Sequence, residues 1–218
     1  MSNHSKTLLF GYVNAPKLPQ YLEELAYTQW QSHQGDYFAK SIGQSNGYLD
    51  RKVKKDGKIQ GGNTWKTVML GNELLIWAKN NLSQKVNDVR LSCNDPGNNY
   101  LGSHVDMTRD FAIIYPVRTG GPYATTCIYF DKTFNGLTPP NLSFANNYQE
   151  DYDKLVTVSQ LQIPQRTWVL MNGKAMHGVE NISEGRIIIH ASIDDISDLD
   201  ITHASYYEYN PPIGVDFS

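Results

Sequence analysis

The chain has 218 residues, of which 40% are hydrophobic and 19% charged, and its formal net charge is −3. These values are typical of a folded globular protein and exclude a disordered chain. The slight negative charge argues against a broad nucleic-acid or membrane-binding surface, although a local basic patch is compatible with it. At this length we expect a single domain over residues 1–218, of the larger all-β kind.

The termini and the cysteines bear on the compartment. The first residues lack the apolar core of a secretion signal, and no apolar run is long enough to span a membrane. The two cysteines, Cys93 and Cys127, each lie in an alternating apolar segment, which favours two buried thiols over a disulfide. We therefore expect a cytoplasmic protein.

The first part of the chain predicts one short strand and two helices. The strand is expected over residues 7–13, and a helix opened by a proline over residues 19–30. A second helix is expected over residues 73–82, with Asn72 as its N-cap. Helices that precede a sheet usually pack on its outer surface, so we expect both of them there.

Two polar segments interrupt these patterns. Segment 35–65 carries a basic run from Arg51 to Lys58, and Asp56-Gly57 within it is a typical hairpin turn. The favoured interpretation is a solvated β-ribbon, and the alternative is a mobile basic flap that closes over an acidic substrate. Segment 131–154 has no periodicity, which leaves open substrate recognition and a plain surface excursion.

From residue 89 onward the chain reads as β-structure. Gly120-Gly121-Pro122 is a turn between two strands, and a strongly β-branched run begins at Arg186. In that run both faces carry residues suited to burial, one purely apolar and one mixed. The predicted strands cover residues 89–93, 111–117, 123–130, 155–158, 166–171 and 186–193.

One predicted strand end carries His104 and Asp106, which alternation places on the same face, so an imidazole and a carboxylate converge. A second histidine, His177, follows a later strand and turn, and Arg186 comes nine residues after it. Two histidines and one carboxylate with open coordination positions make the facial triad of non-haem iron oxygenases. The guanidinium of Arg186 is suited to clamping an anion, because it binds a carboxylate through two parallel hydrogen bonds.

This pattern resembles the Fe(II)- and 2-oxoglutarate-dependent dioxygenases over roughly residues 86–195. The resemblance implies an all-β core, a double-stranded β-helix or jelly roll at about 86–210, with flanking N-terminal α-helices. It implies that His104, Asp106 and His177 bind Fe(II) and that Arg186 pairs with the distal carboxylate of 2-oxoglutarate. It also implies a cosubstrate contact for the hydroxyl of Tyr115, while a hydroxyl satisfied elsewhere in the sheet stays an equal alternative.

The stretch 93–106, with its Pro-Gly-Asn turn and Tyr100, also resembles the prolyl hydroxylase branch of these enzymes. That branch implies hydroxylation of an amino-acid side chain, peptidyl proline first, with O2 consumed, succinate and CO2 released, and ascorbate as an optional stimulant. The sequence departs from the branch at Asn94-Asp95, where a tyrosine often precedes the Pro-Gly pair. It departs from other branches at Ile188, where a serine often stands.

Several alternatives stay open. A cupin-like metal-binding protein or a non-oxidative metal enzyme would use the same fold, but has no use for a buried Arg186. An oxygenase of the same kind would also serve a free amino acid, a small metabolite or a nucleobase in place of a peptide or protein. His190 shares a face with Arg186 and competes as a metal ligand, although a hydrogen-bonded core histidine is the commoner outcome. Retention of Asp106 favours hydroxylation over halogenation, since the halogenases of the superfamily replace this carboxylate.

Overall fold

The computed structural model describes residues 6–32, 52–55, 58–62, 65–94, 100–106, 108–138 and 152–208. Within these ranges it has two α-helices, α1 (Gln20–Ser32) and α3 (Asn72–Asn81), and one 3-10 turn, η2 (Tyr152–Lys154). The strands are β1 (Lys6–Val13), β2 (Lys52–Lys55), β3 (Lys58–Gly62), β4 (Trp65–Met69), β5 (Asp88–Asn94), β6 (Tyr100–His104), β7 (Phe111–Thr119), β8 (Thr125–Asp131), β9 (Leu155–Leu161), β10 (Val169–Asn172), β11 (His177–Glu180), β12 (Arg186–Ile193) and β13 (Ile201–Glu208).

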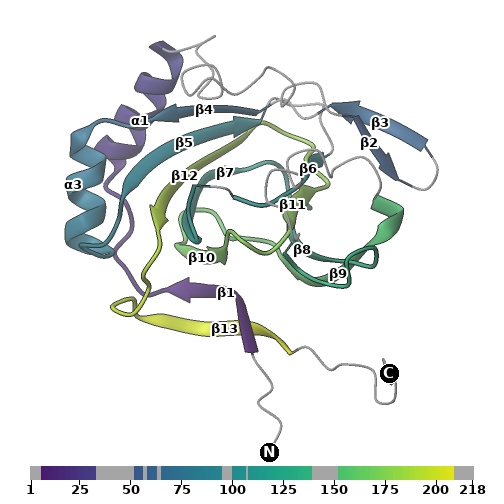
Figure 1. Cartoon of the computed structure of the whole chain (residues 1–218). Helices are drawn as coiled ribbons and strands as arrows, with labels where there is room; N and C mark the ends of the chain where they lie inside the picture. The colour runs from purple at the N-terminus through teal and green to yellow at the C-terminus, as the bar shows by residue number, and fades with distance from the viewer. Residues whose placement is uncertain are drawn as a thin grey trace, which may run out of the picture.

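The strands from β5 to β12 form one long antiparallel hairpin that is wound into a barrel (Figure 1). β5 pairs with β12, β6 with β11, β7 with β10 and β8 with β9, so the second half of the run returns along the first. Further pairing of β12 with β7 and of β11 with β8 closes successive turns of the hairpin. This nested pairing is that of a double-stranded β-helix, and the predicted all-β jelly-roll fold is confirmed.

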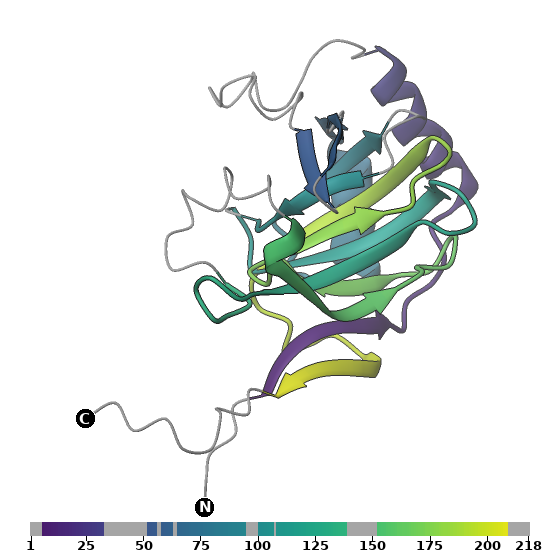
Figure 2. The ribbon, with the colours of Figure 1, turned by 90° about the vertical axis from the view of Figure 1, so that its right-hand side faces the viewer.

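Two sheets face each other around the interior, as the turned view makes clear (Figure 2). The larger sheet has the order β13-β1-β10-β7-β12-β5-β4, and the smaller one has the order β6-β11-β8-β9. β1, β13 and β4 extend the larger sheet beyond the jelly roll. An apolar cluster that includes Ile114, Ile128 and Met171 fills the space between the sheets. The interior is therefore a packed core, with a small number of polar side chains set into it.

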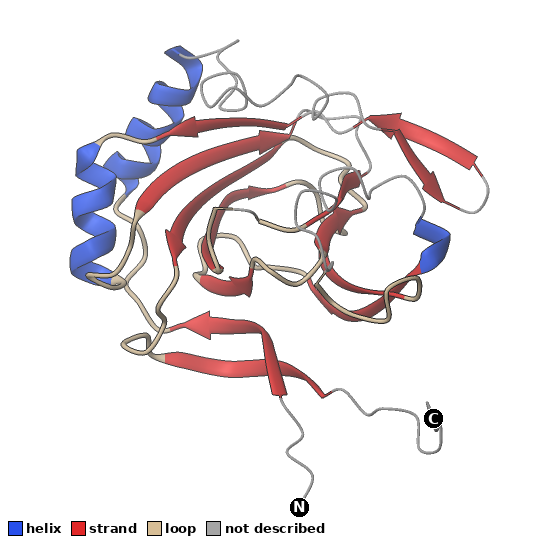
Figure 3. Cartoon of the chain, in the orientation of Figure 1, coloured by secondary structure: helices blue, strands red, loops and turns tan. Residues whose placement is uncertain are grey.

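Both helices lie on the outer face of the larger sheet, as expected (Figure 3). Leu22 of α1 and Leu74 of α3 join the same buried cluster as the outward-facing side chains of the sheet. The expected N-cap is wrong: Gly71 caps α3 with an extended backbone, and Asn72 is already helical. Glycine is tolerated at this position because the cap residue needs a non-helical backbone, and here no side-chain cap bond forms.

Strand β12 is buried along its whole length, because it has a hydrogen-bonded neighbour on each side and a core on each face. Ile187, Ile189 and Ala191 belong to the cluster under the helices, and Ile188 belongs to the cluster between the sheets. The prediction that both faces of this run are buried is confirmed. Arg186, at the start of the strand, shares the interior side with Ile188.

The basic segment forms a separate two-stranded ribbon. β2 and β3 pair antiparallel, with Lys55 opposite Lys58, which confirms the predicted β-ribbon. Strand β4, which pairs with β5 at the sheet edge, was not predicted. The turn at 56–57 and the parts of the polar segments at 33–51 and 139–151 lie outside the described residues. Neither helix in the described ranges has the length and apolar composition to cross a bilayer.

Tyr115 lies on the helix-facing side of the larger sheet, opposite Ile189 of β12. Its hydroxyl donates to Glu23 Oε1 at 3.0 Å, and its ring packs on Trp168 with centroids 4.4 Å apart. Burial and the bond to Glu23 raise the pKa of Tyr115 above its usual value. Arg186 faces the interior, so the expectation that Tyr115 contacts a cosubstrate held by Arg186 is wrong.

We predict that Tyr115→Phe lowers the free energy of unfolding by about 1–2 kcal/mol, because the buried carboxylate of Glu23 loses a donor while Arg166 still binds it at 3.0 Å. Urea unfolding measures this change. The matched control is Tyr123→Phe, where the residue is 70% exposed and the expected change is within about 0.5 kcal/mol. Equal stability of the two variants would contradict the structural role of Tyr115.

Candidate metal centre

The three residues singled out in the sequence come together at the start of the smaller sheet. His104 ends β6 and lies directly across from His177, which begins β11, and Asp106 follows β6 by two residues. Their ligand atoms all lie within 4.8 Å of one another, and the two imidazole centroids are 4.3 Å apart. Of the residues with described positions, these are the one group of three or more metal-binding side chains close enough to hold an ion.

The cluster faces the interior of the jelly roll. His177 is paired with Ile128, a member of the cluster between the sheets, so the two side chains point to the same side. His104 and His177 are 6% and 4% exposed, and the side chain of Asp106 is 10% exposed. Because so little of each side chain is exposed, water has limited access to these three groups.

His177 is held in one tautomer. Its Nδ1 donates to the carbonyl oxygen of Ala175 at 2.8 Å, and since a carbonyl only accepts, Nδ1 carries the proton and Nε2 carries the lone pair. Burial lowers the pKa of His177 below its usual value, more than the negative charge of Asp106 raises it. The imidazole is therefore neutral at neutral pH, which is the form that binds a metal.

Asp106 carries the negative charge of the cluster. Burial acts to raise its pKa, but the positive charge of Arg109 and its hydrogen bond act against this, and the pKa lies well below its usual range. Arg109 Nε donates to Asp106 Oδ2 at 2.7 Å. Asp106 is thus an ionised carboxylate even without a cation between it and the histidines.

The turn after β10 fits closely around Asp106. The backbone N–H of Asp106 donates to the carbonyl of Gly173 at 2.7 Å, and Lys174 Nζ donates to the carbonyl of Asp106 at 3.0 Å. A Cβ atom at residue 173 would lie 2.9 Å from Asp106 Oδ2 and 3.0 Å from Asp106 Cβ. Glycine is therefore required at 173, because a side chain there would push the carboxylate out of place.

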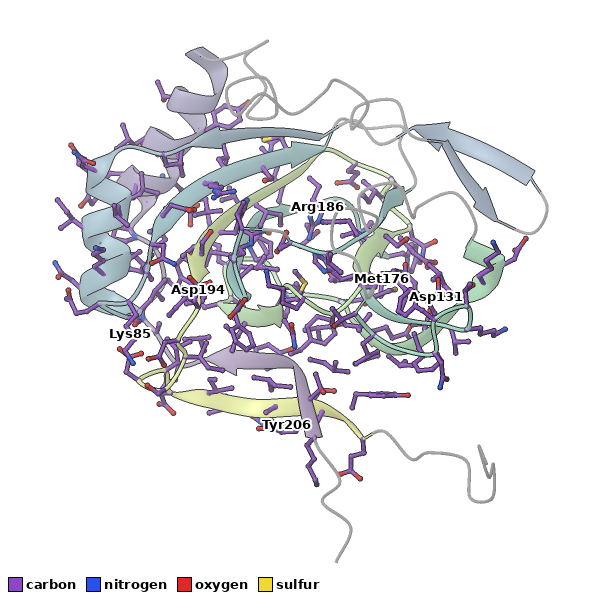
Figure 4. The ribbon with its side chains drawn as sticks, in the orientation of Figure 1. Lys85, Asp131, Met176, Arg186, Asp194 and Tyr206 are labelled. Atoms are coloured by element: carbon purple, nitrogen blue, oxygen red, sulfur yellow. The ribbon has the colours of Figure 1, made fainter. Side chains whose placement is uncertain are left out.

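Arg186 is a buried cation in the same interior (Figure 4). It is 7% exposed, and burial lowers its pKa to about 10, so the guanidinium is still positive at neutral pH. No side chain in the described part of the chain pairs with it by a hydrogen bond or an ion pair. The Cα of Gly120 packs against its stem, where an added Cβ would lie 3.0 Å from Arg186 Cβ. A buried charge needs a compensating partner, and a carboxylate is the natural one.

His190 does not join the cluster. Its Nε2 lies 2.7 Å from Ser92 Oγ, and its Nδ1 accepts from Arg109 Nη1. Burial and the charge of Arg109 lower its pKa far below the usual value, so the ring is neutral. With both nitrogens engaged His190 has no lone pair for a metal, and its position matches the core histidine that was the commoner expectation.

Arg109 is the contact to Asp106 that the sequence patterns did not predict. The signal that was available is its spacing, three residues after the carboxylate. In a loop, a spacing of three residues does not predict a contact between two side chains, because the direction of each side chain depends on tertiary contacts. The side chain of Arg109 is 10% exposed, so it belongs to the buried surroundings of the cluster.

No protein-family model matches the chain, and no curated protein matches it. Among solved structures, AviO1 from Streptomyces viridochromogenes Tue57 aligns with a TM-score of 0.42 and 14% identity over 88% of this chain and 91% of that chain. A Pseudomonas putida prolyl-4-hydroxylase aligns with a TM-score of 0.37 and 11% identity over 88% of this chain and 94% of that chain.

Two features define the class of this protein: the order of its strands and the side chains in its interior. The wound pairing of β5 to β12 makes the fold a double-stranded β-helix, as the resemblance implied. The interior of that fold carries a candidate metal centre of two histidines and one aspartate. The buried cation Arg186 lies in the same interior.

We predict that Gly173→Ala weakens binding of a divalent metal by about tenfold or more, because the added methyl group displaces Asp106. Anaerobic titration of the metal-free protein with Co(II) measures the dissociation constant. Gly136→Ala is the control, since its Cβ would meet the ring of Phe134 at 3.4 Å and the carbonyl oxygen of Thr138 at 3.8 Å, both ordinary contacts. Equal Co(II) affinity in the two variants would show that Asp106 does not depend on the close fit at residue 173.

Proposed function

We propose that this chain is an Fe(II)- and 2-oxoglutarate-dependent dioxygenase. The observation that carries the proposal is the presence, inside one jelly roll, of the His104, Asp106 and His177 cluster together with the buried cation Arg186. The metal cluster alone would also suit a binding protein, and the buried arginine alone would also suit a structural ion pair. Together they supply both things that this reaction needs from a protein, a facial metal site and an anchor for a dicarboxylate.

The donor set fits iron. Two imidazole nitrogens and one carboxylate oxygen suit Fe(II) and leave open positions, whereas softer metals favour thiolates. Both cysteines, Cys93 and Cys127, are buried thiols outside any disulfide, and neither joins the metal-binding group. His104, Asp106 and His177 would hold the ion, with Asp106 already ionised and His177 already in the binding tautomer.

Arg186 supports the oxygenase over a cupin-like binding protein or a non-oxidative metal enzyme. A metal site alone gives no reason to bury a guanidinium nearby, because desolvating a charge costs several kcal/mol unless an anion compensates it. The distal carboxylate of 2-oxoglutarate is such an anion, and the planar guanidinium binds it through two parallel bonds. The buried position of Arg186 on β12 keeps water from competing for that bond.

The role of each group in the proposed reaction follows from these positions. When bound, iron supplies the activation of O2 and the oxidation of a substrate C–H bond, with 2-oxoglutarate leaving as succinate and CO2. Arg186 orients the cosubstrate by its far end. The apolar cluster of Ile114, Ile128 and Ile188 limits the access of water to the interior. We place this reaction in the cytoplasm, where Fe(II) and 2-oxoglutarate are available.

We expect Arg186→Ala to retain Fe(II) binding and to lose 2-oxoglutarate affinity by about 2–5 kcal/mol, or roughly 30-fold to several thousand-fold, because a desolvated charge pair loses one partner. His177→Ala should lose Fe(II) itself. Anaerobic calorimetry with Fe(II), then with 2-oxoglutarate, separates the two effects. Arg118→Ala, which removes an exposed arginine of β7, and His203→Ala, which removes an exposed histidine of β13, are the matched controls.

Two results would overturn the proposal. Unchanged Fe(II) affinity in His177→Ala would remove the metal assignment. Unchanged 2-oxoglutarate affinity in Arg186→Ala, together with a loss of stability, would make Arg186 a structural residue and return the cupin-like and non-oxidative alternatives.

We further propose that the substrate is an amino-acid side chain, with proline in a peptide or protein first. The support is the resemblance of stretch 93–106 to prolyl hydroxylases and the presence of Asp106, which favours hydroxylation. The basic ribbon of β2 and β3 adds a preference for an acidic partner, since opposite charges steer association. Free amino acids, small metabolites and nucleobases are the alternatives.

The substrate proposal predicts succinate release coupled to a product heavier by one oxygen atom with proline-containing peptides. Assays with peptides, free amino acids and nucleobases in parallel, read by mass spectrometry, decide among them. Association with an acidic peptide should slow as salt is raised, because screening weakens the steering by the ribbon. Coupled turnover on a free amino acid or nucleobase, with none on any peptide, would reject this substrate and leave the oxygenase proposal standing.

A further inference from the structure

Arg109 connects the candidate metal centre to the larger sheet. Its Nε donates to Asp106 Oδ2 at 2.7 Å, and its Nη1 donates to His190 Nδ1. The same Nη1 lies 3.4 Å from Ser192 Oγ. One guanidinium thus bonds to the carboxylate on one side and to two side chains of β12 on the other.

The far side of this contact is itself held in place. His190 Nε2 is bonded to Ser92 of β5 at 2.7 Å, and Ser192 donates to Asp88 Oδ1 at 2.7 Å. Asp88 in turn accepts from Arg90 Nε and Nη2, both at 2.8 Å. The guanidinium of Arg109 is therefore oriented by two paired strands in the middle of the larger sheet. Its bond to Oδ2 in turn fixes the carboxylate of Asp106.

The two oxygens of Asp106 differ in their contacts with the described residues. Oδ2 is engaged by Arg109, the backbone N–H is bonded to Gly173, and the backbone carbonyl is bonded to Lys174. A carboxylate held at its backbone and at Oδ2 is not free to turn, because turning would break the bond to Arg109. The bond therefore favours Oδ1 as the oxygen that binds a metal.

We propose that Arg109 is a positioning residue that restricts Asp106 to a one-oxygen ligand. The inference rests on the proposed function, and its consequence concerns coordination positions. A carboxylate that binds through both oxygens takes two positions, whereas one oxygen takes one. With two positions used by 2-oxoglutarate and one needed by O2, a second oxygen from Asp106 would compete for the last position. Arg109 keeps that position open.

Charge alone does not account for the arrangement. A lysine ammonium in this place would neutralise Asp106, but its donors sit on one atom, while the guanidinium directs Nε and Nη1 to partners on two sides. Both Arg109 and Asp106 have side chains that are 10% exposed, so water does not substitute for either bond. The role therefore depends on the shape of the guanidinium, and this separates it from a simple ion pair.

The test is Arg109→Lys in the full chain, loaded with Co(II) alone in place of Fe(II). We expect Co(II) affinity to fall by about 10- to 100-fold, and the visible spectrum of the bound Co(II) to change because the coordination by Asp106 changes. Arg118→Lys is the matched control, because it makes the same change at an exposed arginine of β7 that has no part in this network. It should leave the affinity and spectrum of Co(II) as in the wild type.

A second measurement needs no variant. A crystal structure of the Co(II)-loaded wild type should show Asp106 Oδ1 on the metal and Oδ2 still bonded to Arg109. Two Asp106 oxygens on the metal, or a wild-type affinity and spectrum in Arg109→Lys, would overturn the inference and leave the metal site intact. If the wild type binds no Co(II), or if His177→Ala binds it equally well, the metal assignment fails and the inference fails with it.

Discussion

The pairing of β6 with β11 is the constraint on which the candidate site depends. It puts His104 directly across from His177, and both imidazoles on the interior side of the smaller sheet. Side chains alternate along a strand, so a slip of one residue in this register would turn one imidazole to the outer face. The register is stabilised from the other side of β11, where the pairing with β8 aligns His177 with the buried Ile128. Because both imidazoles stand on paired strands, they are held to within the tolerance that a metal requires.

The second feature of the interior is the balance of its charges. Asp106 is the anion of the metal cluster, Arg109 pairs with it, and Arg186 has no anion among the described side chains. In a poorly hydrated interior these charges act strongly on one another, which is why Arg109 lowers the pKa of Asp106 despite burial. Asp106 and Arg109 neutralise each other as a pair. Arg186 leaves one positive charge in the interior, which an anion would compensate.

The outer layers serve to hold this interior rigid. Strand β12 carries Arg186 at its start and His190 near its middle, and its outward-facing isoleucines are buried beneath the helices. Tyr115, Glu23 and Trp168 form a polar and aromatic contact on that same outer side. A buried hydrogen-bonded network of this kind specifies one packing of the helices on the sheet. The positions of the inward-facing side chains depend on this packing of the helices on the sheet.

The sequence by itself determined the all-β class, the two helices and the residues of the metal cluster. It did so because the two histidines and one aspartate of the cluster are residue types with a recognisable metal chemistry. Strand alternation does not account for Asp106, because β6 ends at His104. The burial of both faces of the run 186–193 also follows from its composition. These are properties of short stretches, which tertiary contacts refine but do not create.

Only the tertiary structure decided the rest. The residue types of Tyr115 and Ile188 are common on both faces of a β-sheet. The pairing of β7 with β12, which has a bulge between Ile187 and Ile188, places the two side chains on opposite faces. The bond of Arg109 to His190 joins residues 81 positions apart, a separation that no local sequence pattern covers. Likewise, the need for glycine at residue 173 arises from a carboxylate that approaches it from another part of the chain. The winding of the hairpin decides which residues meet across the interior, and no single stretch of sequence determines this winding.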